Sequence, residues 1–415
     1  MNNSDTTPTI NYNNTETHNG YKKTAIGVIP VDWNTKKLGD LGEIINGLTY
    51  SPNDIHNDGI LVLRSSNIKE RQLVYTDNVF VKADKFNPVK KGDILICVRN
   101  GSKSLIGKNA LITEEAEGYA FGAFMAVFRS DYNNYLYQIF GTDLFQKEIH
   151  KNLGATINSI NGSDLKLFKL PIPPLAEQQK IAEILSTWDE AIANCKNTIN
   201  TLKDRNKGLG HQLLTGKKRL SGFSDKWIQT TIEKITNYFS NKNKGLIDAR
   251  IYSVTNSNGF VYQSDHFSRE VAGDDLTGYK IIGKNEFAYN PARINVGSIA
   301  FFTDDIGIIS SLYVCFKTNE KVSNEFFIEW LKIEKTKHDI ERYGEGGVRI
   351  YLWYDLFKKL KINLPSIDEQ TAIAQVLETA DQELKSYQTK LEALQLQKKG
   401  LMQQLLTGKI RVNVK

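Results

Sequence analysis

An internal repeat constrains this chain more than any other feature of its sequence. The phrase QLLTGKKRL at 212–220 returns almost unchanged as QLLTGKIRV at 404–412, 192 residues later. Walking back from both phrases, the spacing of 192 holds without a gap, and 18 of 44 positions are identical between 177–220 and 369–412. Such a mixed phrase does not recur in order by compositional drift, so the chain is a duplication, and the duplication fixes its architecture.

Outside these shared segments the two halves keep a fainter likeness. FGAFMAVFR (121–129) aligns with ISSLYVCFK (309–317), whereas the halves diverge most over 40–170 and 234–360. The order is therefore variable block, shared segment, variable block, shared segment. With 415 residues the chain is long enough for about two or three domains, each with its own core.

The shared segments predict two long helices. Apolar residues recur in alternating steps of four and three over more than four heptads, a period that is typical of coiled coils. Each segment follows proline and ends at a glycine (Gly216, Gly408), and the second opens with a capping box from Ser366 to Glu369. The residues predicted to form the seam between the helices are Leu185, Trp188, Ile192, Ile199, Leu202, Leu377, Ala380, Leu384, Leu391 and Leu394.

Two such helices in one chain pack most economically on each other, antiparallel, as a stem with one domain near each end. Pairing about midpoints near 197 and 389 places Asn206 opposite Ala380. It also places Lys398 opposite Trp188, where the ammonium would lie over the indole ring. The alternative is that each helix packs only on its own domain.

The variable blocks have the pattern of mixed α/β domains rich in short strands. The sequence therefore predicts an α+β fold: two mixed α/β domains, separated by two long antiparallel helices that form a coiled-coil stem, with a pseudo-two-fold internal repeat. Strands are expected at 59–68, 92–98, 118–128, 250–255, 285–290 and 307–316, and shorter helices at 134–152 and 324–343.

The predicted boundaries divide the chain into six segments. They are a disordered tail at 1–24, a first variable domain at 25–172, a first spacer helix at 173–216, a second variable domain at 217–364, a second spacer helix at 365–408 and a basic tail at 409–415. The N-terminal tail is polar and lacks the basic and apolar regions of a signal peptide.

Loops dense in Arg, Lys, Asn and Ser lie between the expected strands in both halves. Arg and Asn make bidentate contacts to guanine and adenine edges, and Ser and Lys suit phosphates, so these loops predict DNA contacts. The alternative for each residue is a solvated surface side chain. The candidate DNA-binding residues are Arg64, Ser65, Asn67, Arg99, Asn100, Ser102, Lys103, Lys108, Asn158, Asn161, Asn256, Asn258, Asn290, Arg293, Asn295 and Arg349.

Other classes of protein find no support in the sequence. The six histidines have no metal-ligand spacing, and neither a nucleophile elbow nor a phosphate-binding P-loop sequence is present. NPAR (290–293) lacks the second proline and the aromatic residue of amino-methyltransferase motifs. Three unclustered cysteines favour a reducing compartment, and no apolar run is long enough to cross a bilayer, so a cytoplasmic protein is expected.

These features together resemble the specificity subunit of type I restriction–modification systems. The likeness rests on LPIPPLAEQQKIAEIL and LPSIDEQTAIAQVL, each following a divergent domain, and on the two QLLTGK endings. It implies that the variable domains are target recognition domains, each reading half of a bipartite double-stranded DNA site. The helices would set the spacing between the halves and bind two methyltransferase (modification) subunits, and restriction subunits would complete the complex.

The resemblance also implies that this chain is not an enzyme by itself and binds no cofactor or metal of its own. S-adenosylmethionine would belong to the methyltransferase partner, and ATP with Mg²⁺ to the restriction partner. Two alternatives remain from the residues alone: a DNA-binding or architectural protein outside restriction, which would not copurify with a methyltransferase, and a self-sufficient methyltransferase, which would transfer methyl groups alone.

Overall fold

The computed structural model describes residues 20–153, 158–266, 275–346 and 351–414. The chain divides into two compact units: unit 1 contains residues 1–194 together with 391–415, and unit 2 contains 195–390. The helices α4 (Leu175–Leu214) and α9 (Ile367–Leu405) lie within the segments 173–216 and 365–408 that were predicted for the two spacer helices. Each helix contributes one part to either unit, so unit 1 is assembled from both ends of the chain.

Unit 1 contains two small sheets with helices beside them. The larger sheet is antiparallel and has the order β10 (Asn109–Leu111), β9 (Ile94–Cys97), β12 (Met125–Arg129), β4 (Glu43–Asn46). In the second, β5 (Ile55–Leu63) lies between β11 (Ala120–Phe121), which is parallel to it, and β8 (Phe80–Val81). The described residues of unit 1 also form the strand pairs β1 (Tyr21–Thr24) with β2 (Gly27–Pro30), β3 (Asn34–Lys37) with β13 (Lys169–Ile172) and β6 (Ile68–Lys69) with β7 (Gln72–Leu73), and the short helices α1 (Asn133–Phe140), α2 (Asp143–Asn152) and α3 (Gly162–Lys166).

Unit 2 repeats this plan. Its first sheet has the order β15 (Thr236–Phe239), β22 (Val314–Thr318), β19 (Glu286–Tyr289), β20 (Ile299–Phe301), which matches the first sheet of unit 1 strand for strand. Its second sheet has the order β17 (Gly259–Tyr262), β16 (Ile251–Thr255), β21 (Ile306–Ile309), β18 (Lys280–Gly283), again with one parallel pair, β16 and β21. The other elements are β14 (Ile228–Thr231) paired with β23 (Lys361–Leu364), α5 (Gln263–His266), α6 (Asn324–Lys332), α7 (Glu334–Tyr343) and α8 (Tyr354–Phe357).

Several predicted elements are shorter than expected because the chain turns within them. The strand expected at 118–128 is two strands, β11 and β12, and the one at 307–316 is likewise β21 and β22. The helix expected at 134–152 breaks between α1 and α2 at Gly141, where a Cβ would overlap the Arg71 guanidinium. The helix at 324–343 breaks at Ile333, the strand at 59–68 ends at Leu63, and Tyr21–Thr24 belongs to β1 rather than to a tail.

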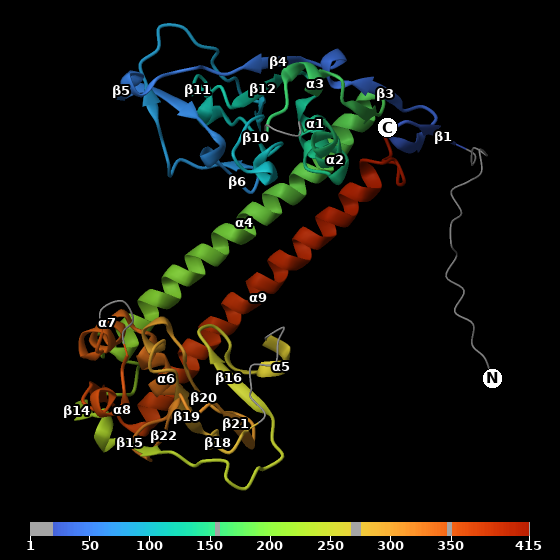
Figure 1. Cartoon of the computed structure of the whole chain (residues 1–415). Coiled ribbons are helices and arrows are strands. Elements are labelled where there is room, and N and C mark those ends of the chain that lie inside the picture. Colours follow the sequence, from blue (N-terminus) through green and yellow to red (C-terminus); the bar gives the residue numbers. More distant parts are fainter. Residues whose placement is uncertain (1–19, 154–157, 267–274, 347–350, 415) are drawn as a thin grey trace, which may run out of the picture. The chain divides into compact units, whose positions relative to one another are not determined.

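Each unit has a core that draws on both long helices. In unit 1, Ile181 and Leu185 of α4 join Leu405 and Leu406, at the end of α9, in one buried cluster. In unit 2, Leu213 and Leu214 at the end of α4 join Ile373 and Leu377 of α9. The alternative that each helix packs only on its own domain is therefore wrong, and within each unit the two helices run side by side and antiparallel (Figure 1).

All the residues that were predicted to form the seam between the helices are buried or half-buried. Leu185, Ile199, Leu202, Leu377 and Ala380 are buried, and Trp188, Ile192, Leu384, Leu391 and Leu394 are half-buried. The predicted register is confirmed at Asn206, whose side-chain amide donates to the Ala380 carbonyl at 2.9 Å.

Lys398 does not use the Trp188 ring as expected. Its side chain is 10% exposed, and its ammonium forms an ion pair with Asp189, the next residue along α4. Burial lowers the pKa of Lys398, and the Asp189 carboxylate opposes that shift. A carboxylate is the better partner here, because a largely buried ammonium gains more from a full opposite charge than from a ring quadrupole.

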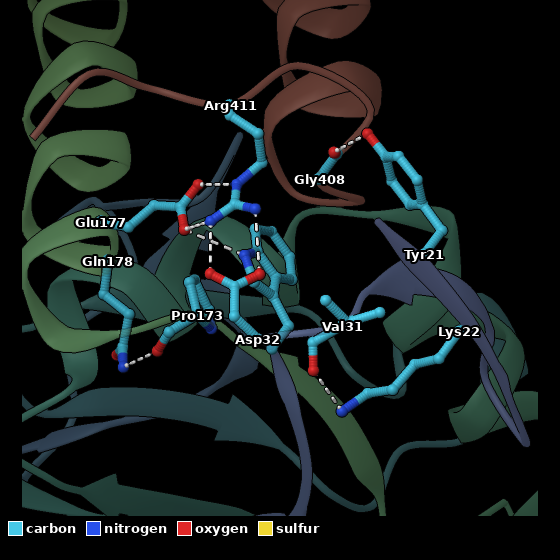
Figure 2. A network of polar contacts seen from close by, with 10 residues as sticks. Tyr21, Lys22, Val31, Asp32, Pro173, Glu177, Gln178, Gly408 and Arg411 are labelled. Carbon is cyan, nitrogen blue, oxygen red and sulfur yellow. Dashed lines mark hydrogen bonds and ion pairs between the residues drawn. The ribbon is translucent and has the colours of Figure 1, made fainter. Parts of the chain in front are cut away.

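The repeated phrase is explained by a polar clamp at the start of α4. Glu177 is 1% exposed and accepts a hydrogen bond from the Trp33 indole at 3.0 Å and two from Arg411, both at 2.8 Å. Arg411 lies just beyond the end of α9 and also contacts both carboxylate oxygens of Asp32, as Figure 2 shows. These hydrogen bonds raise the pKa of Arg411 and lower that of Asp32.

Unit 2 contains the same clamp, 192 residues away at two of its positions. Arg219, beyond the end of α4, binds both oxygens of Glu369 at the start of α9, and the Trp227 indole donates to the same carboxylate at 3.2 Å. Only the Ser366 half of the predicted capping box forms, through the Glu369 amide, because the Glu369 side chain is held by Arg219 instead.

Glycine in the repeated phrase lets each chain turn after its helix. Gly216 and Gly408 adopt positive φ of 72° and 70°, which a side chain would strain, and a Cβ at Gly408 would lie 2.4 Å from Pro30. The Leu-Leu pair before the glycine fills the core, the glycine turns the chain, and the arginine after it reaches the buried glutamate.

Replacing Arg411 by alanine should destabilise unit 1, because it leaves the Glu177 carboxylate buried without a cation. We expect the free energy of unfolding to fall by about 1–3 kcal/mol, less than for a fully buried pair, because 42% of the arginine side chain is exposed. Urea denaturation followed by circular dichroism measures the change. The matched control is Glu177→Gln with Arg411→Met, which removes both charges and should recover most of the loss. A midpoint for Arg411→Ala equal to that of the wild type would contradict the clamp.

Candidate nucleic-acid interface

Three distant segments of unit 1 bring their candidate DNA-binding residues together. The Asn100 amide donates to the Ser65 hydroxyl at 3.1 Å, and the Lys108 ammonium donates to the Ser65 carbonyl at 2.9 Å. Asn158 reaches the same cluster by donating to the Gly101 carbonyl at 2.8 Å. The loops after β5 and β9 and the segment before α3 therefore lie against one another.

Exposure separates these candidates into groups. Arg99, Ser102, Lys103 and Asn161 are exposed, whereas Ser65, Asn100, Lys108 and Asn158 are half-buried and already hydrogen-bonded within the cluster. The exposed group is free to reach a groove or a phosphate. The half-buried group shapes the loops that carry it.

Asn67 is not available for DNA, and this prediction is wrong. Its side chain is 0% exposed, accepts from the Arg64 amide at 3.0 Å and donates to the Val74 carbonyl at 3.1 Å. An asparagine that satisfies backbone groups in this way holds a turn closed. Sequence pattern alone does not separate this use of asparagine from base recognition.

Arg64 lines a cavity, but its guanidinium is already paired with a carboxylate. Its guanidinium binds the Asp77 carboxylate at 2.8 Å and the Asp77 carbonyl at 2.9 Å, and 32% of its side chain is exposed. It lines a cavity of about 540 Å³ whose wall also includes Tyr50, Ser65 and Phe124. Asp77 reduces the positive charge that Arg64 presents to a polyanion.

A half-buried arginine, Arg71, which polar-loop reasoning did not select, binds Asn109, the residue after Lys108. Arg71 lies in a two-residue turn between β6 and β7, in which Glu70 and Arg71 have φ of 50° and 63°. Its guanidinium stacks 3.9 Å from the Tyr137 ring centroid and donates to Asn109 at 3.2 Å, and burial lowers its pKa. Positive φ at two non-glycine residues is unfavourable, so tertiary contacts hold the turn.

In unit 2 the candidates occupy two neighbouring loops. Asn256 and Asn258 are exposed in the turn between β16 and β17, and Arg293 is exposed beyond β19. Gly297, with φ of 97°, brings the loops together, because a Cβ there would lie only 3.2 Å from the Asn256 carbonyl oxygen.

The remaining candidates of unit 2 are less accessible or lie outside the described residues. Asn290 and Asn295 are half-buried, and the Asn290 side chain accepts from the Ala292 amide at 3.0 Å. Arg349 lies outside the described residues. Nearby, Tyr351 and Trp353 stack with ring centroids 6.3 Å apart and are 37% and 47% exposed; polar-loop reasoning did not select them.

Within the part of the chain that the structure describes, no group of three His, Cys, Asp or Glu residues is placed to hold a metal ion. Across those same residues, no helix is both long enough and apolar enough to span a membrane. The three cysteines are buried and unpaired, and burial raises the pKa of Cys315 to about 12, so its thiol stays protonated.

Comparison with known proteins identifies the family of this duplicated chain. The family model described as the type I restriction modification DNA specificity domain matches the chain twice, over residues 30–204 and 252–396. The chain therefore belongs to the family of type I restriction–modification specificity subunits, and the resemblance seen in its sequence is confirmed.

Individual relatives cover the whole chain or one half of it. The proposed type I restriction enzyme MjaX specificity subunit of Methanocaldococcus jannaschii is 29% identical over 423 residues, which cover 94% of this chain and 97% of the relative. The EcoKI specificity subunit of Escherichia coli K12 is 33% identical over 172 residues, 39% of this chain and 37% of the relative.

Solved structures share the fold. The S subunit of the type I system from M. genitalium matches with a TM-score of 0.56 and 18% identity, covering 92% of this chain and 97% of that one. A chain from a structure on complex assembly and conformational transition of the type I system matches with a TM-score of 0.53 and 11% identity, covering 92% and 99%. At these identities the likeness concerns the fold alone.

The sorting by exposure makes a prediction about four alanine variants. In the assembled complex, Arg99→Ala and Arg293→Ala should weaken binding to the target duplex by about 1–3 kcal/mol if the arginine reads a guanine. Lys103→Ala should weaken all sequences alike and reduce the salt dependence by about one unit of slope. Asn67→Ala should instead lower the melting temperature of the free subunit. Fluorescence anisotropy across a salt series separates these effects.

Lys91→Ala is the control for that series, because this exposed lysine precedes β9, at the opposite end of the strand from Arg99, and pairs with Glu114. If all three cation variants bind DNA like the wild type at every salt concentration, these residues are ordinary surface residues that do not contact DNA.

Proposed function

We propose that this chain is the DNA-reading subunit of a type I restriction–modification complex, with each unit's recognition domain reading one half of a bipartite double-stranded site. The observation that carries this proposal is one framework present twice with different loops. The four-stranded sheets β10-β9-β12-β4 and β15-β22-β19-β20 match strand for strand, the second sheet of each unit contains one parallel pair, and both halves of the chain match the DNA specificity domain. The loops that carry exposed Arg, Lys and Asn are the parts that differ.

In this proposal α4 and α9 fix the number of unread base pairs between the half-sites. Each is a continuous helix, of 40 and 39 residues, so α4 extends about 60 Å at 1.5 Å per residue. Polar pairs at two levels, Asn206 with Ala380 and Lys398 with Asp189, specify one register for the pair. A pair that cannot slip is suited to act as a ruler.

The same proposal includes two methyltransferase subunits, with restriction subunits completing the complex. Support for two copies of one partner comes from a groove present in each unit where a long helix ends. In unit 1 it lies between the α1–α2 break and Leu406 and Thr407; in unit 2 it lies between Ile333 and Leu214 and Thr215. S-adenosylmethionine belongs to the methyltransferase and ATP with Mg²⁺ to the restriction partner. The complex acts in the cytoplasm, and this chain supplies recognition rather than catalysis.

Exchanging one recognition domain tests the division of labour. Replacing residues 25–172 by the equivalent block of a relative should change one half of the methylated motif and leave the other half and the gap unchanged. Methylation sequencing of cells that carry the system reads both halves and the gap at once. Exchanging residues 217–364 instead is the matched control and should change the other half. A change in both halves from a single exchange would contradict the proposal that each domain reads its half-site independently.

Lengthening both helices together tests the ruler. One heptad inserted after Asn194 in α4 and one after Lys390 in α9 keeps both halves of the pairing in register and adds about 10 Å. We expect unchanged half-sites separated by a gap about three base pairs longer, measured by the same sequencing. A heptad inserted in the loop between Ser221 and Gly222 should leave the gap as it is. An active variant with both helices lengthened and the original gap would exclude the ruler.

A further inference from the structure

Each unit presents one exposed apolar side chain at the same place in the fold. In unit 1 the turn Gly122–Met125 joins β11 to β12, and the Met125 amide donates to the Gly122 carbonyl at 2.8 Å. In unit 2 the turn Ser310–Tyr313 joins β21 to β22, with the Tyr313 amide donating to the Ser310 carbonyl at 3.2 Å. The third residue of each turn is apolar and exposed: Phe124 is 57% exposed and Leu312 is 69% exposed.

The turns hold these side chains firmly although the side chains themselves face solvent. In unit 1 the residues Phe121 and Met125 flanking the turn are each 1% exposed, and the Val98 and Arg99 amides donate to the Phe124 carbonyl at 3.0 and 3.1 Å. In unit 2 Tyr313, 9% exposed, accepts at its hydroxyl from the Val254 amide and at its carbonyl from Lys280. An apolar residue on a rigid turn is presented at a low cost in conformational entropy.

The surroundings of Phe124 combine cationic, hydroxyl and apolar groups. The Arg99 guanidinium lies 5.6 Å from the centroid of its ring, and Arg64 and Ser65 share the wall of the adjoining cavity. Tyr50 and Ile55 line the same cavity, so an apolar group of a ligand can be buried beside the Phe124 ring while its polar groups meet the cations.

The turn that carries Leu312 is held by contacts of its neighbour Tyr313. The buried Lys280 donates to the Tyr313 carbonyl, and the Tyr313 hydroxyl accepts from the Val254 amide on β16, the strand that leads to the exposed Asn256. Each turn therefore adjoins a segment that leads to candidate DNA-binding residues: the Phe124 turn adjoins Arg99, and the Leu312 turn adjoins the end of β16.

We propose that Phe124 and Leu312 are base-reading residues, each packing against a thymine methyl group in the major groove of its own half-site. The 5-methyl group of thymine is the apolar feature of that groove, and apolar side chains contact it. The exposed Arg99 beside Phe124 would meet a phosphate or a guanine edge. The inference rests on the proposed function, because it assigns a contact to a DNA-reading domain.

The experiment uses the assembled complex and a duplex carrying the motif found by methylation sequencing. Each thymine of the motif is replaced in turn by uracil, which pairs identically but lacks the methyl group. We expect wild-type binding to fall about tenfold at one thymine in the half read by unit 1. Phe124→Ala should bind the unmodified duplex about tenfold more weakly and lose no more at that uracil. Leu312→Ala should show the same pattern in the other half.

Exposed apolar residues away from the loops serve as matched controls. Leu167→Ala in unit 1 and Ile228→Ala in unit 2, at positions 59% and 72% exposed, should retain the wild-type uracil profile. The inference is overturned if no uracil weakens wild-type binding, or if the alanine variants keep the same sensitivity to uracil as the wild type. Failure of the wild-type complex to prefer the motif over unrelated duplex would instead overturn the proposed function.

Discussion

A buried carboxylate at the first turn of each long helix is the interaction on which the rest of this structure depends. Glu177 and Glu369 are each 1% exposed, and a desolvated charge is unfavourable unless it is paired and hydrogen-bonded. Each is paired by an arginine that follows the end of the other long helix and by a tryptophan indole. This requirement ties the end of one helix to the start of the other in both units, and the antiparallel pairing of the helices within each unit follows from it.

The two clamps are similar but not identical, and the difference is electrostatic. In unit 1 Arg411 has a second carboxylate, Asp32, directly before Trp33. In unit 2 the residue before Trp227 is Lys226, and Arg219 donates to the Asp225 backbone carbonyl instead. The end of α9 is therefore held by two carboxylates, whereas the end of α4 is held by one. Unit 1, whose segments are far apart in sequence, therefore has one ion pair more at its clamp.

Much of the framework could be predicted from the sequence because it repeats. The 3.5-residue period gave both helices, and pairing about their midpoints put Asn206 on Ala380, where the structure has it. Local signals failed where tertiary contacts decide the outcome. Nothing in the sequence around Gly141 indicates that Arg71, 70 positions earlier, fills the space at the helix break. The loops were located, but asparagine's two uses could not be separated, so Asn67 was assigned to DNA although it closes a turn. The sequence repeat aligns Phe124 with Leu312 and Arg219 with Arg411. These pairs occupy equivalent places in the two units, which the chemistry of each residue alone could not indicate.

The division of the chain between the units has a consequence for how the protein is made. Unit 2 is one uninterrupted stretch, 195–390, and all of its contacts are available as soon as that stretch has left the ribosome. Unit 1 begins first but ends last: its core needs Leu405 and Leu406, and its buried Glu177 waits for Arg411. During synthesis unit 2 can thus be complete before unit 1, and the unit whose first residues are translated earliest closes only after residues 391–412, which follow all of unit 2, have been made.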